Sequence, residues 1–255
     1  MKLGVVAAVN KHDVLEQNLL RSPMIAEGQI PLQTEEGHAT CSSAYNTGMD
    51  AIDADVIVLA HQDVYLPRGW DERLMSCVST IEEEGTDWGV LGVYGVRESA
   101  EHVGQVWSTG LQRELDSRVE TPQTTVSLDE LVIVVKRDDR LRFDESLPGF
   151  HLYGTDIVQT ALDCGMNTLV FPGPVIHNSS PVRRLPSIYW QAHRYLSQKW
   201  RGRMPIPTCT VGLPTRIQDR MRFFARHVRD SMLTRPEPAQ RLEDPAAKAR
   251  ELGYE

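Results

Sequence analysis

The sequence predicts an α/β fold, a mostly parallel sheet flanked by helices, with a C-terminal helical extension. Short, nearly continuous apolar segments recur along the chain, as is typical of strands that are buried on both faces. Segments with helical periodicity separate them, and this alternation produces a parallel sheet covered on both sides. The length of 255 residues fits one large domain that buries a core without disulfides.

Five apolar runs are the expected strands. The first ends at Asn10, and the second is followed at once by a polar triplet, so both have sharp carboxyl ends. Strands of this kind lie in the centre of a sheet, where both faces are covered. In chain order, the expected strands are residues 3–9, 56–60, 88–96, 131–135 and 168–171.

The segments between these runs contain the expected helices. Asp13 suits a helix start, and residues 69–84 place Trp70, Leu74 and Val78 on one face. Gly165 falls where a helix C-cap belongs. The expected helices are residues 13–20, 42–53, 69–84, 155–164, 187–200 and 215–233.

Two stretches read as irregular. Residues 22–38 hold two prolines and two glycines and are interpreted as a loop with one short strand at residues 24–25. Residues 98–125 are polar, and loops of that length are often functional lids. The domain boundaries expected are 1–180 for the main domain, 181–235 for helices packed on it, and 236–255 for a flexible tail with a weak terminal helix.

Composition excludes several classes of protein. With 35 acidic and 27 basic residues, the net charge of −8 argues against a nucleic-acid binder. Four widely spaced cysteines form no CxxC pair, which favours reduced thiols in the cytoplasm over a zinc site. The apolar stretch at the N-terminus is too short for a membrane span. The arginines of the C-terminal helices are read as a solvated face, with peripheral contact to anionic lipid as the alternative.

Polar side chains follow two of the expected strands at their carboxyl ends. His61, Gln62 and Asp63 follow residues 56–60, and Asn10 follows the first strand. In open α/β sheets, ligands bind beyond these carboxyl ends. A carboxylate there can hold a hard divalent cation while substrate phosphates fill the remaining positions. The alternative for Asp63 is a turn-forming role, and for His61 a structural hydrogen bond.

His177 also follows an apolar segment, "LVFPGPVIH", and can therefore reach the same sheet edge. Together with Asp63 it would make a reasonable Mn²⁺ or Mg²⁺ site with open positions for phosphate and water. The alternative is a loop histidine that bonds to Ser179 or Ser180.

Two residues are candidates for a general base. Asp156 opens the helix after "GFHLYGT", where it could accept a hydroxyl proton or simply complement the helix dipole. His151 lies in the same loop and could contact substrate or serve a structural role.

Four segments together resemble a glycosyltransferase of the GT-A fold, close to the bacterial family 2-like members. They are "KLGVVAAVN", "AYNTGMDAIDADVIVLAHQDVYLPRGW", "RFDESLPGFHLYGTDIVQTALDCG" and "NTLVFPGPVIHNSS", which occur in the family's order over most of residues 1–180. The resemblance implies transfer of a sugar, with inversion, from a nucleotide-diphosphate sugar to an unknown acceptor hydroxyl. A UDP-sugar is the expected donor, and the activity is expected to be hexosyltransferase-like.

The resemblance also implies roles for individual residues. In the family, a DxD motif holds the Mn²⁺ or Mg²⁺ that bridges the donor diphosphate. Asp63 matches its last position, while His61 stands where the first Asp is usual. The trailing His177 resembles a histidine that often joins the metal. Val9, Asn10, Asn46, Gln62 and Trp107 are the further expected donor contacts, with Trp107 in the candidate lid.

At the base-bearing helix the chain departs from the family pattern. Asp156 matches the further Asp of that region, and Gly154 falls where the usual base sits. Asp129 and Glu130 would lie near the donor sugar or acceptor hydroxyls by the same resemblance, with a solvated strand start as the alternative.

Two other functions remain open from the sequence. One is a non-catalytic nucleotide-sugar-binding or interaction module derived from the same fold, which the substituted first Asp and Gly154 would suit. The other is a nucleotidyltransferase, which would need a glycine-rich loop after the first strand, whereas "VNKHDVLEQN" contains no glycine.

Overall fold

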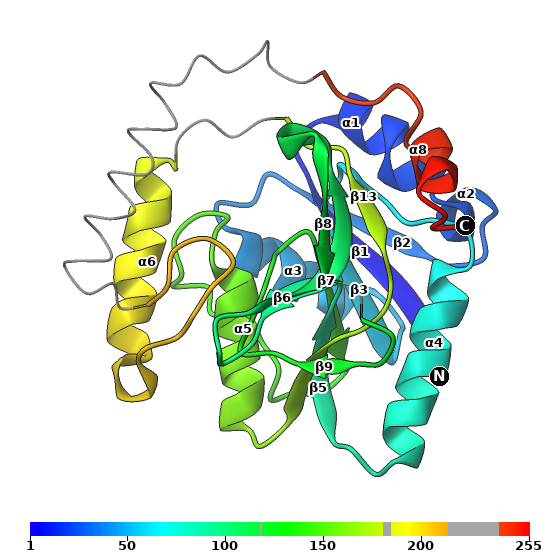
Figure 1. Ribbon diagram of the computed structural model, residues 1–255. Coiled ribbons are helices and arrows are strands. Elements are labelled where there is room, and N and C mark those ends of the chain that lie inside the picture. Colours follow the sequence, from blue (N-terminus) through cyan, green and yellow to red (C-terminus); the bar gives the residue numbers. More distant parts are fainter. Residues whose placement is uncertain (118, 181–184, 214–239) are drawn as a thin grey trace.

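Two β-sheets form the centre of the structure, a computed structural model that describes residues 1–117, 119–180, 185–213 and 240–255. Figure 1 shows the strands in the middle, with α5 and α6 to one side and α4 to the other. The strands are β1 Leu3–Val9, β2 Leu32–Glu36, β3 Val56–Ala60, β4 Val64–Tyr65, β5 Trp88–Gly92, β6 Tyr94–Val96, β7 His102–Ser108, β8 Arg113–Ser117, β9 Gln123–Thr124, β10 Ser127–Leu128, β11 Val132–Lys136, β12 Asn167–Val170 and β13 Val175–His177. The helices are α1 His12–Gln17, α2 Pro23–Ala26, α3 Cys41–Ala51, α4 Trp70–Glu83, α5 Tyr153–Asp163, α6 Ser187–Lys199 and α8 Pro245–Glu251, with short 3₁₀ turns at Leu19–Arg21, Thr109–Leu111 and Arg201–Arg203.

The larger sheet has seven strands in the order β2-β1-β3-β11-β5-β12-β9. Strand β1 pairs in parallel with β2 and β3, and β12 pairs in parallel with β5. Strand β11 is antiparallel to both of its neighbours, and β9 is antiparallel to β12. The carboxyl ends of β1, β3 and β5 therefore meet at one edge, as the mostly parallel sheet predicted from the sequence requires.

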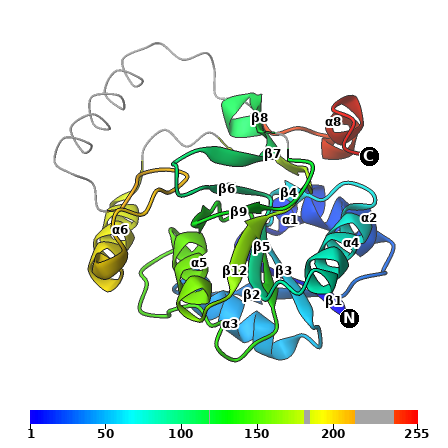
Figure 2. The same ribbon diagram turned by 60° about the horizontal axis from the view of Figure 1, so that its bottom comes forward.

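Successive residues of the central strands point to opposite faces, and each face has its own core. Val6 and Ile57 pack with Tyr45 of α3 and with α5, whereas Val58 packs with Leu74 of α4 on the other face. Figure 2 shows α3 and α5 on one side of the strands and α4 on the other. Covering both faces explains why these strands are continuous apolar runs.

A smaller sheet has six strands, five in the order β10-β6-β7-β13-β4 and the sixth, β8, paired to β7. The segment expected to be one strand over residues 88–96 breaks at the buried Val93, so β5 and β6 belong to different sheets. The stretch at 98–125, expected to be an irregular lid, instead contributes the β7–β8 hairpin. Its polar residues fit a sheet of which one face stays partly exposed.

The prediction for residues 22–38 was wrong in detail. Residues 23–26 form the short helix α2, and β2 lies at Leu32–Glu36, an edge strand whose sequence is mostly polar. An edge strand is covered less than a central one, so it lacks the apolar run by which the central strands are recognised. Strand β2 extends the sheet beside β1 and forms one wall of the site described below.

Helix α6 confirms the helix expected over 187–200, while the helix expected over 215–233 lies outside the described residues. The described part of the expected tail, residues 240–255, forms α8 and packs on the smaller sheet. Ala249 and Tyr254 are buried there against Tyr65 of β4 and Ile176 of β13. In the described part of the chain, no helix is both long and apolar enough to cross a membrane.

Candidate active site

The loop after β3 and the end of β13 bring His61, Asp63 and His177 together. Strand β13 pairs antiparallel with β4, which places His177 opposite Val64, and the Asn178 N–H donates to the Asp63 carbonyl over 2.8 Å. His177 Nε2 lies 3.4 Å from Asp63 Oδ1, and His61 Nδ1 lies 4.0 Å from the same oxygen. Backbone pairing thus fixes three potential ligands from distant parts of the sequence.

Asp63 and His177 stabilise each other's charged form. Burial alone would raise the pKa of Asp63, but the charge of His177, its hydrogen bond, His61 and Arg241 together hold that pKa well below its usual range. Burial alone would lower the pKa of His177, and the Asp63 carboxylate outweighs it, so the pKa of His177 is raised. At pH values below the raised pKa of His177, the two side chains therefore form an ion pair in the metal-free protein.

His61 differs from His177 in its protonation. Burial lowers the pKa of His61, and the nearby positive charge of His177 adds to this, so its imidazole is neutral at pH 7. Its Nε2 lies 2.8 Å from the hydroxyl of Tyr153, which also donates to the Glu130 carbonyl oxygen at 3.1 Å. The Tyr153 contact leaves Nδ1 of His61 directed toward Asp63.

The three residues fit a divalent metal ion. One donor atom from each of His61, Asp63 and His177 lies within 4.8 Å of the others. Two imidazoles and one carboxylate leave coordination positions for phosphate oxygens or water, and imidazole ligands favour Mn²⁺ over the harder Mg²⁺. Asp63 supplies the charge and His61 a neutral nitrogen, the form in which histidine binds metals.

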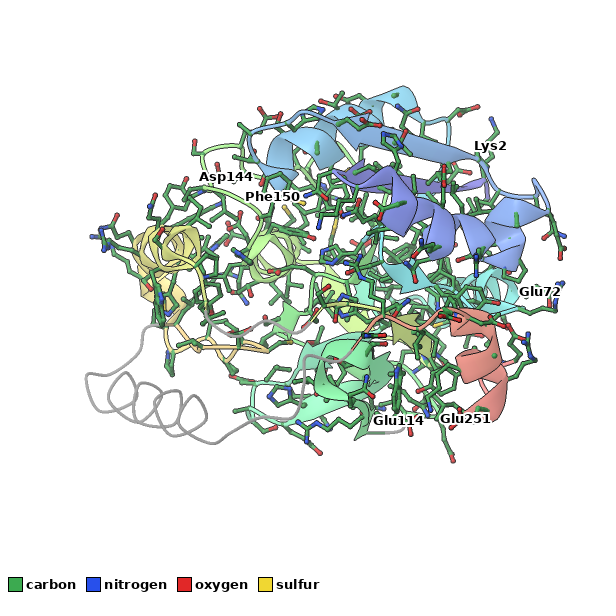
Figure 3. The ribbon with its side chains drawn as sticks, turned by 90° about the horizontal axis from the view of Figure 1, so that it is seen from above. Lys2, Glu72, Glu114, Asp144, Phe150 and Glu251 are labelled. Atoms are coloured by element: carbon green, nitrogen blue, oxygen red, sulfur yellow. The ribbon has the colours of Figure 1, made fainter. Side chains whose placement is uncertain are left out.

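A cavity of about 420 Å³ opens beside this cluster, at the carboxyl ends of β1 and β3. Its walls come from β1, the end of β2, the β2–α3 loop, α3, the loop after β3 and the residues around the start of α5. Phe150 is 45% exposed and presents an aromatic side chain to the cavity, and Figure 3 shows it in the loop before α5. The lining residues are Ala8, Val9, Asn10, Glu35, Gly37, His38, Cys41, Ala44, Tyr45, His61, Gln62, Asp63, Phe150 and Tyr153.

Gln62 joins the two strand ends at the cavity. Its Oε1 accepts hydrogen bonds from the backbone N–H groups of Asn10 at 3.1 Å and Lys11 at 3.0 Å, and its Nε2 donates to Asn10 Oδ1. The amide therefore holds the turn after β1 against the turn after β3. Val9, Asn10 and Gln62 thus lie together at the cavity, as the strand-end argument predicts.

Asn46 and Trp107, two other predicted donor contacts, are not among the lining residues of this cavity. Asn46 is buried on α3, where its side chain exchanges hydrogen bonds with the Phe143 backbone and donates to Glu145. Trp107 lies on β7, with Lys248 Nζ of α8 at 4.0 Å from its ring centroid. Asn46 fastens a loop to α3, and Trp107 packs against the C-terminal helix.

The two base candidates also lie outside the lining of the cavity. Asp156 is buried, and its carboxylate accepts hydrogen bonds from Lys199 Nζ at 2.9 Å and from the Trp200 indole at 2.7 Å. Both partners come from α6 and its C-cap, so Asp156 ties α5 to α6. His151 is half-buried with its ring against Tyr189, and burial lowers its pKa.

Sequence comparison with known proteins finds a likeness over part of the chain. No family model matches the chain. A protein of Fuscovulum blasticum described as "ATP synthase subunits region ORF 6" is 30% identical over 112 residues, which are 40% of this chain and 42% of that protein. The chain thus spans less than half of this relative.

Solved structures show a clearer likeness, although sequence identity is low. GalNAc-T7 with UDP, GalNAc and Mn²⁺ matches 89% of this chain and 54% of its own, with a TM-score of 0.50 and 13% identity. The chain has the GT-A fold. TarS 1–349 of S. aureus matches 89% of this chain and 71% of its own at a TM-score of 0.48 and 11% identity. The mannosyltransferase PcManGT of Pyrobaculum calidifontis, in complex with GDP-Man and Mn²⁺, matches 90% of this chain and 64% of its own. Its TM-score is 0.44 and its sequence identity 13%.

In this GT-A fold, one charged residue at the site escaped the sequence reasoning. Arg241 NH2 lies 3.9 Å from Asp63 Oδ2, and its buried Nε has no hydrogen-bond partner among the described residues. Leu242 exchanges backbone hydrogen bonds with the Asn178 side chain and so fixes Arg241 next to His177 and Asp63. No local pattern marks Arg241, because only the folded C-terminal segment brings it to the sheet edge.

Proposed function

We propose that the protein is a metal-assisted, inverting glycosyltransferase that transfers a sugar from a nucleotide-diphosphate donor to an acceptor hydroxyl. The observation that carries the proposal is the cluster of His61, Asp63 and His177 beside a cavity of about 420 Å³ at the carboxyl edge of a GT-A sheet. Ligands of open α/β sheets bind at this edge, and the cavity is large enough for part of a nucleotide.

The cavity offers suitable partners for a nucleotide. The exposed ring of Phe150 can stack on the base, an interaction worth about 1–3 kcal/mol per base in other nucleic-acid sites. Glu35 and His38 also line the cavity, where His38 is bonded to Ser43 Oγ and Glu35 Oε2, so the Glu35 carboxylate is the group that can accept a hydrogen bond from the edge of the base. A UDP-sugar is the proposed donor, in agreement with the UDP bound to GalNAc-T7.

The diphosphate would lie at the charged end of the cavity. His61, Asp63 and His177 would hold a divalent ion, with Mn²⁺ proposed ahead of Mg²⁺, and that ion would neutralise charge on the departing diphosphate. Arg241 adds a permanent positive charge at the same place, and a guanidinium can bind phosphate oxygens in a bidentate manner.

The transfer itself breaks the bond between the anomeric carbon and the diphosphate oxygen, whose electron pair leaves with the nucleotide diphosphate. The acceptor oxygen forms the new bond from the opposite face of the sugar, which inverts the anomeric centre. Its proton must pass to a base. Asp156 is held by Lys199 and Trp200, and the ring of His151 packs against Tyr189, so neither is free to take this proton.

Asp63→Ala tests the proposal. Thermal unfolding of the wild type should shift upward with UDP or GDP plus Mn²⁺, because ligands that bind only the folded state stabilise it. In Asp63→Ala we expect the Mn²⁺-dependent part of that shift to disappear and donor hydrolysis to fall by a factor of about 100 or more. Release of UDP from UDP-GlcNAc or UDP-GalNAc, and of GDP from GDP-mannose, measures the activity.

The matched control is Asp53→Ala, since the Asp53 side chain is 88% exposed and forms an ion pair with Lys2 at the surface. It should behave as wild type. Unchanged hydrolysis and an unchanged Mn²⁺ effect in Asp63→Ala would contradict the metal-site assignment. Tight nucleotide binding without hydrolysis of any donor would favour the alternative, a nucleotide-sugar-binding module on the same fold.

A further inference from the structure

Glu130 occupies the place that a side chain at position 154 would need. It lies between β10 and β11, half-buried, against the first turn of α5. A Cβ added to Gly154 would lie 3.2 Å from Glu130 Cγ and 2.7 Å from the Leu128 carbonyl oxygen. Residue 154 can therefore only be glycine in this arrangement, and a carboxylate is nevertheless present at the start of the helix, supplied by Glu130.

The surroundings of Glu130 raise the pKa of its carboxyl. Burial raises the pKa of Glu130 to about 8, the charge of Asp129 adds to the rise, and backbone hydrogen bonding by Leu152 and Gly154 opposes it. Asp129, Leu152 and Gly154, the three residues that act on this pKa, carry no positive charge that would stabilise the carboxylate. Among the described residues, the thiols and phenols whose pKa values are raised in part by Glu130 are neutral at pH 7: Cys41, Tyr45, Tyr153, Tyr189 and Cys209.

Glu130 lies behind Tyr153, which lines the cavity, and its backbone is linked through Tyr153 to the metal-binding cluster, although Glu130 itself is not among the lining residues. The Tyr153 hydroxyl bonds to His61 Nε2 and donates to the Glu130 carbonyl oxygen, so a single phenol lies between them. Asp129, the preceding residue, acts electrostatically on both His61 and His177. Asp156, by contrast, is fixed by Lys199 and Trp200.

We propose that Glu130 is the general base that takes the proton from the acceptor hydroxyl, in the role for which the chain has no carboxylate at position 154. This rests on the proposed function. The O–H bond of the acceptor breaks, the proton goes to a Glu130 oxygen, and the acceptor oxygen bonds to the anomeric carbon as the nucleotide diphosphate leaves. The proton later passes to solvent. A base whose pKa lies near the working pH is suited to this task.

Hydrolysis of the donor tests the assignment without an identified acceptor, because water then supplies the hydroxyl. With UDP-GlcNAc, UDP-GalNAc and GDP-mannose as probes in Mn²⁺, hydrolysis by the wild type should rise with pH through about 8. Glu130→Gln should lower the rate at least 100-fold and flatten this pH profile, while the thermal shift given by UDP or GDP with Mn²⁺ stays as in wild type. Glu130→Asp should keep a measurable, pH-dependent rate.

Glu84→Gln, an exposed change at the C-cap of α4, is the matched control and should retain the wild-type rate. Wild-type hydrolysis by Glu130→Gln, together with its loss in Asp63→Ala, would overturn the base assignment and leave the proposed function standing. If Glu130→Gln loses nucleotide binding together with hydrolysis, Glu130 has a structural role, and the base assignment is again overturned. Absence of both binding and hydrolysis in the wild type would overturn the proposed function, and the base assignment with it.

Discussion

At the scale of single residues, Asp63 is the most heavily shared group of the site. His177, His61 and Arg241 all approach its carboxylate, at 3.4, 4.0 and 3.9 Å respectively. With 17% of its side chain exposed, Asp63 would be costly to leave unpaired. Because these partners belong to the protein itself, the carboxylate is compensated before any metal binds.

Asp156 lies where the sequence suggests a catalytic base, but its hydrogen bonds to Lys199 and Trp200 give it a structural role. Asp156→Asn keeps the shape but removes the charge that attracts Lys199 Nζ, so we expect the free energy of unfolding to fall by about 2 kcal/mol. Asp163→Asn, whose side chain is 64% exposed, should cost less than about 1 kcal/mol. Urea unfolding measures both, and equal losses would contradict the anchoring role.

Glu130 should also make the stability of the protein depend on pH. Its folded pKa of about 8 lies above the ordinary value of 4.5, so the folded state holds a proton that the unfolded state releases. The stability of the wild type relative to Glu130→Gln should therefore fall as pH rises from 4.5 to 8. Urea unfolding of both proteins across this range gives the difference, and a constant difference would contradict the raised pKa.

At the scale of elements, the start of α5 is shaped by what packs on it. Tyr153 of its first turn bonds to His61, and Gly154 allows β10 and Glu130 to approach the helix closely. Helix α5 thus joins the larger sheet to the site, and its first turn tolerates little extra volume.

Gly154→Ala should disturb this contact. Although alanine is the better helix former, its Cβ would meet the Leu128 carbonyl oxygen at 2.7 Å. We expect the free energy of unfolding to fall by about 1–3 kcal/mol, as in other overpacked sites. Gly202→Ala is the control, since nothing lies within 4 Å of its added Cβ. Thermal or urea unfolding compares them, and a more stable Gly154→Ala would refute the close packing.

At the scale of the whole molecule, hydrogen bonds to distant parts of the chain hold residues 240–255 in place. Asn178 is fully buried and donates to Asn18 Oδ1 and to the Leu242 carbonyl, while Leu242 N–H donates back to it. Arg21 reaches the Glu243 carbonyl, and Tyr254 donates to Glu114 of β8. Figure 3 shows α8, with Glu251, on the same side of the molecule as Glu114.

Asn178→Ala should release this segment. Three polar groups, Asn18 Oδ1 and the Leu242 carbonyl and N–H, would lose their partner, so we expect a loss of about 3 kcal/mol in the free energy of unfolding and faster proteolysis near residue 240. Asn167→Ala is the matched control, because Asn167 is exposed and donates only to the Asp87 carbonyl. If both variants resist unfolding and protease as wild type does, Asn178 does not hold the segment.

Much of the central sheet follows from local patterns. Strands β1, β3 and β11 and helices α4 and α5 lie where apolar runs and helical periodicity predict them, because burial dictates their composition. Strand β2 and the β7–β8 hairpin were missed, since strands that are only partly covered need no apolar run.

The same distinction applies to the candidate site. His61, Asp63 and His177 could be predicted to meet because each stands at or just after the end of an apolar run. His177 reaches the other two through the pairing of β13 with β4 in the smaller sheet, which the sequence did not reveal. The positions of Arg241 and Glu130 depend on long-range packing, of α8 on the smaller sheet and of β10 against α5. No spacing rule contains that information.

The contact between Arg241 and Asp63 has a consequence for how the protein reaches its active form. These residues stand far apart in the sequence, and contacts of high sequence separation form late and slowly in folding. A chain emerging from the ribosome can pair β1 with β3 long before Arg241 has been synthesised. The cavity could thus exist early, while the positive charge beside its carboxylate arrives only as synthesis reaches residue 241.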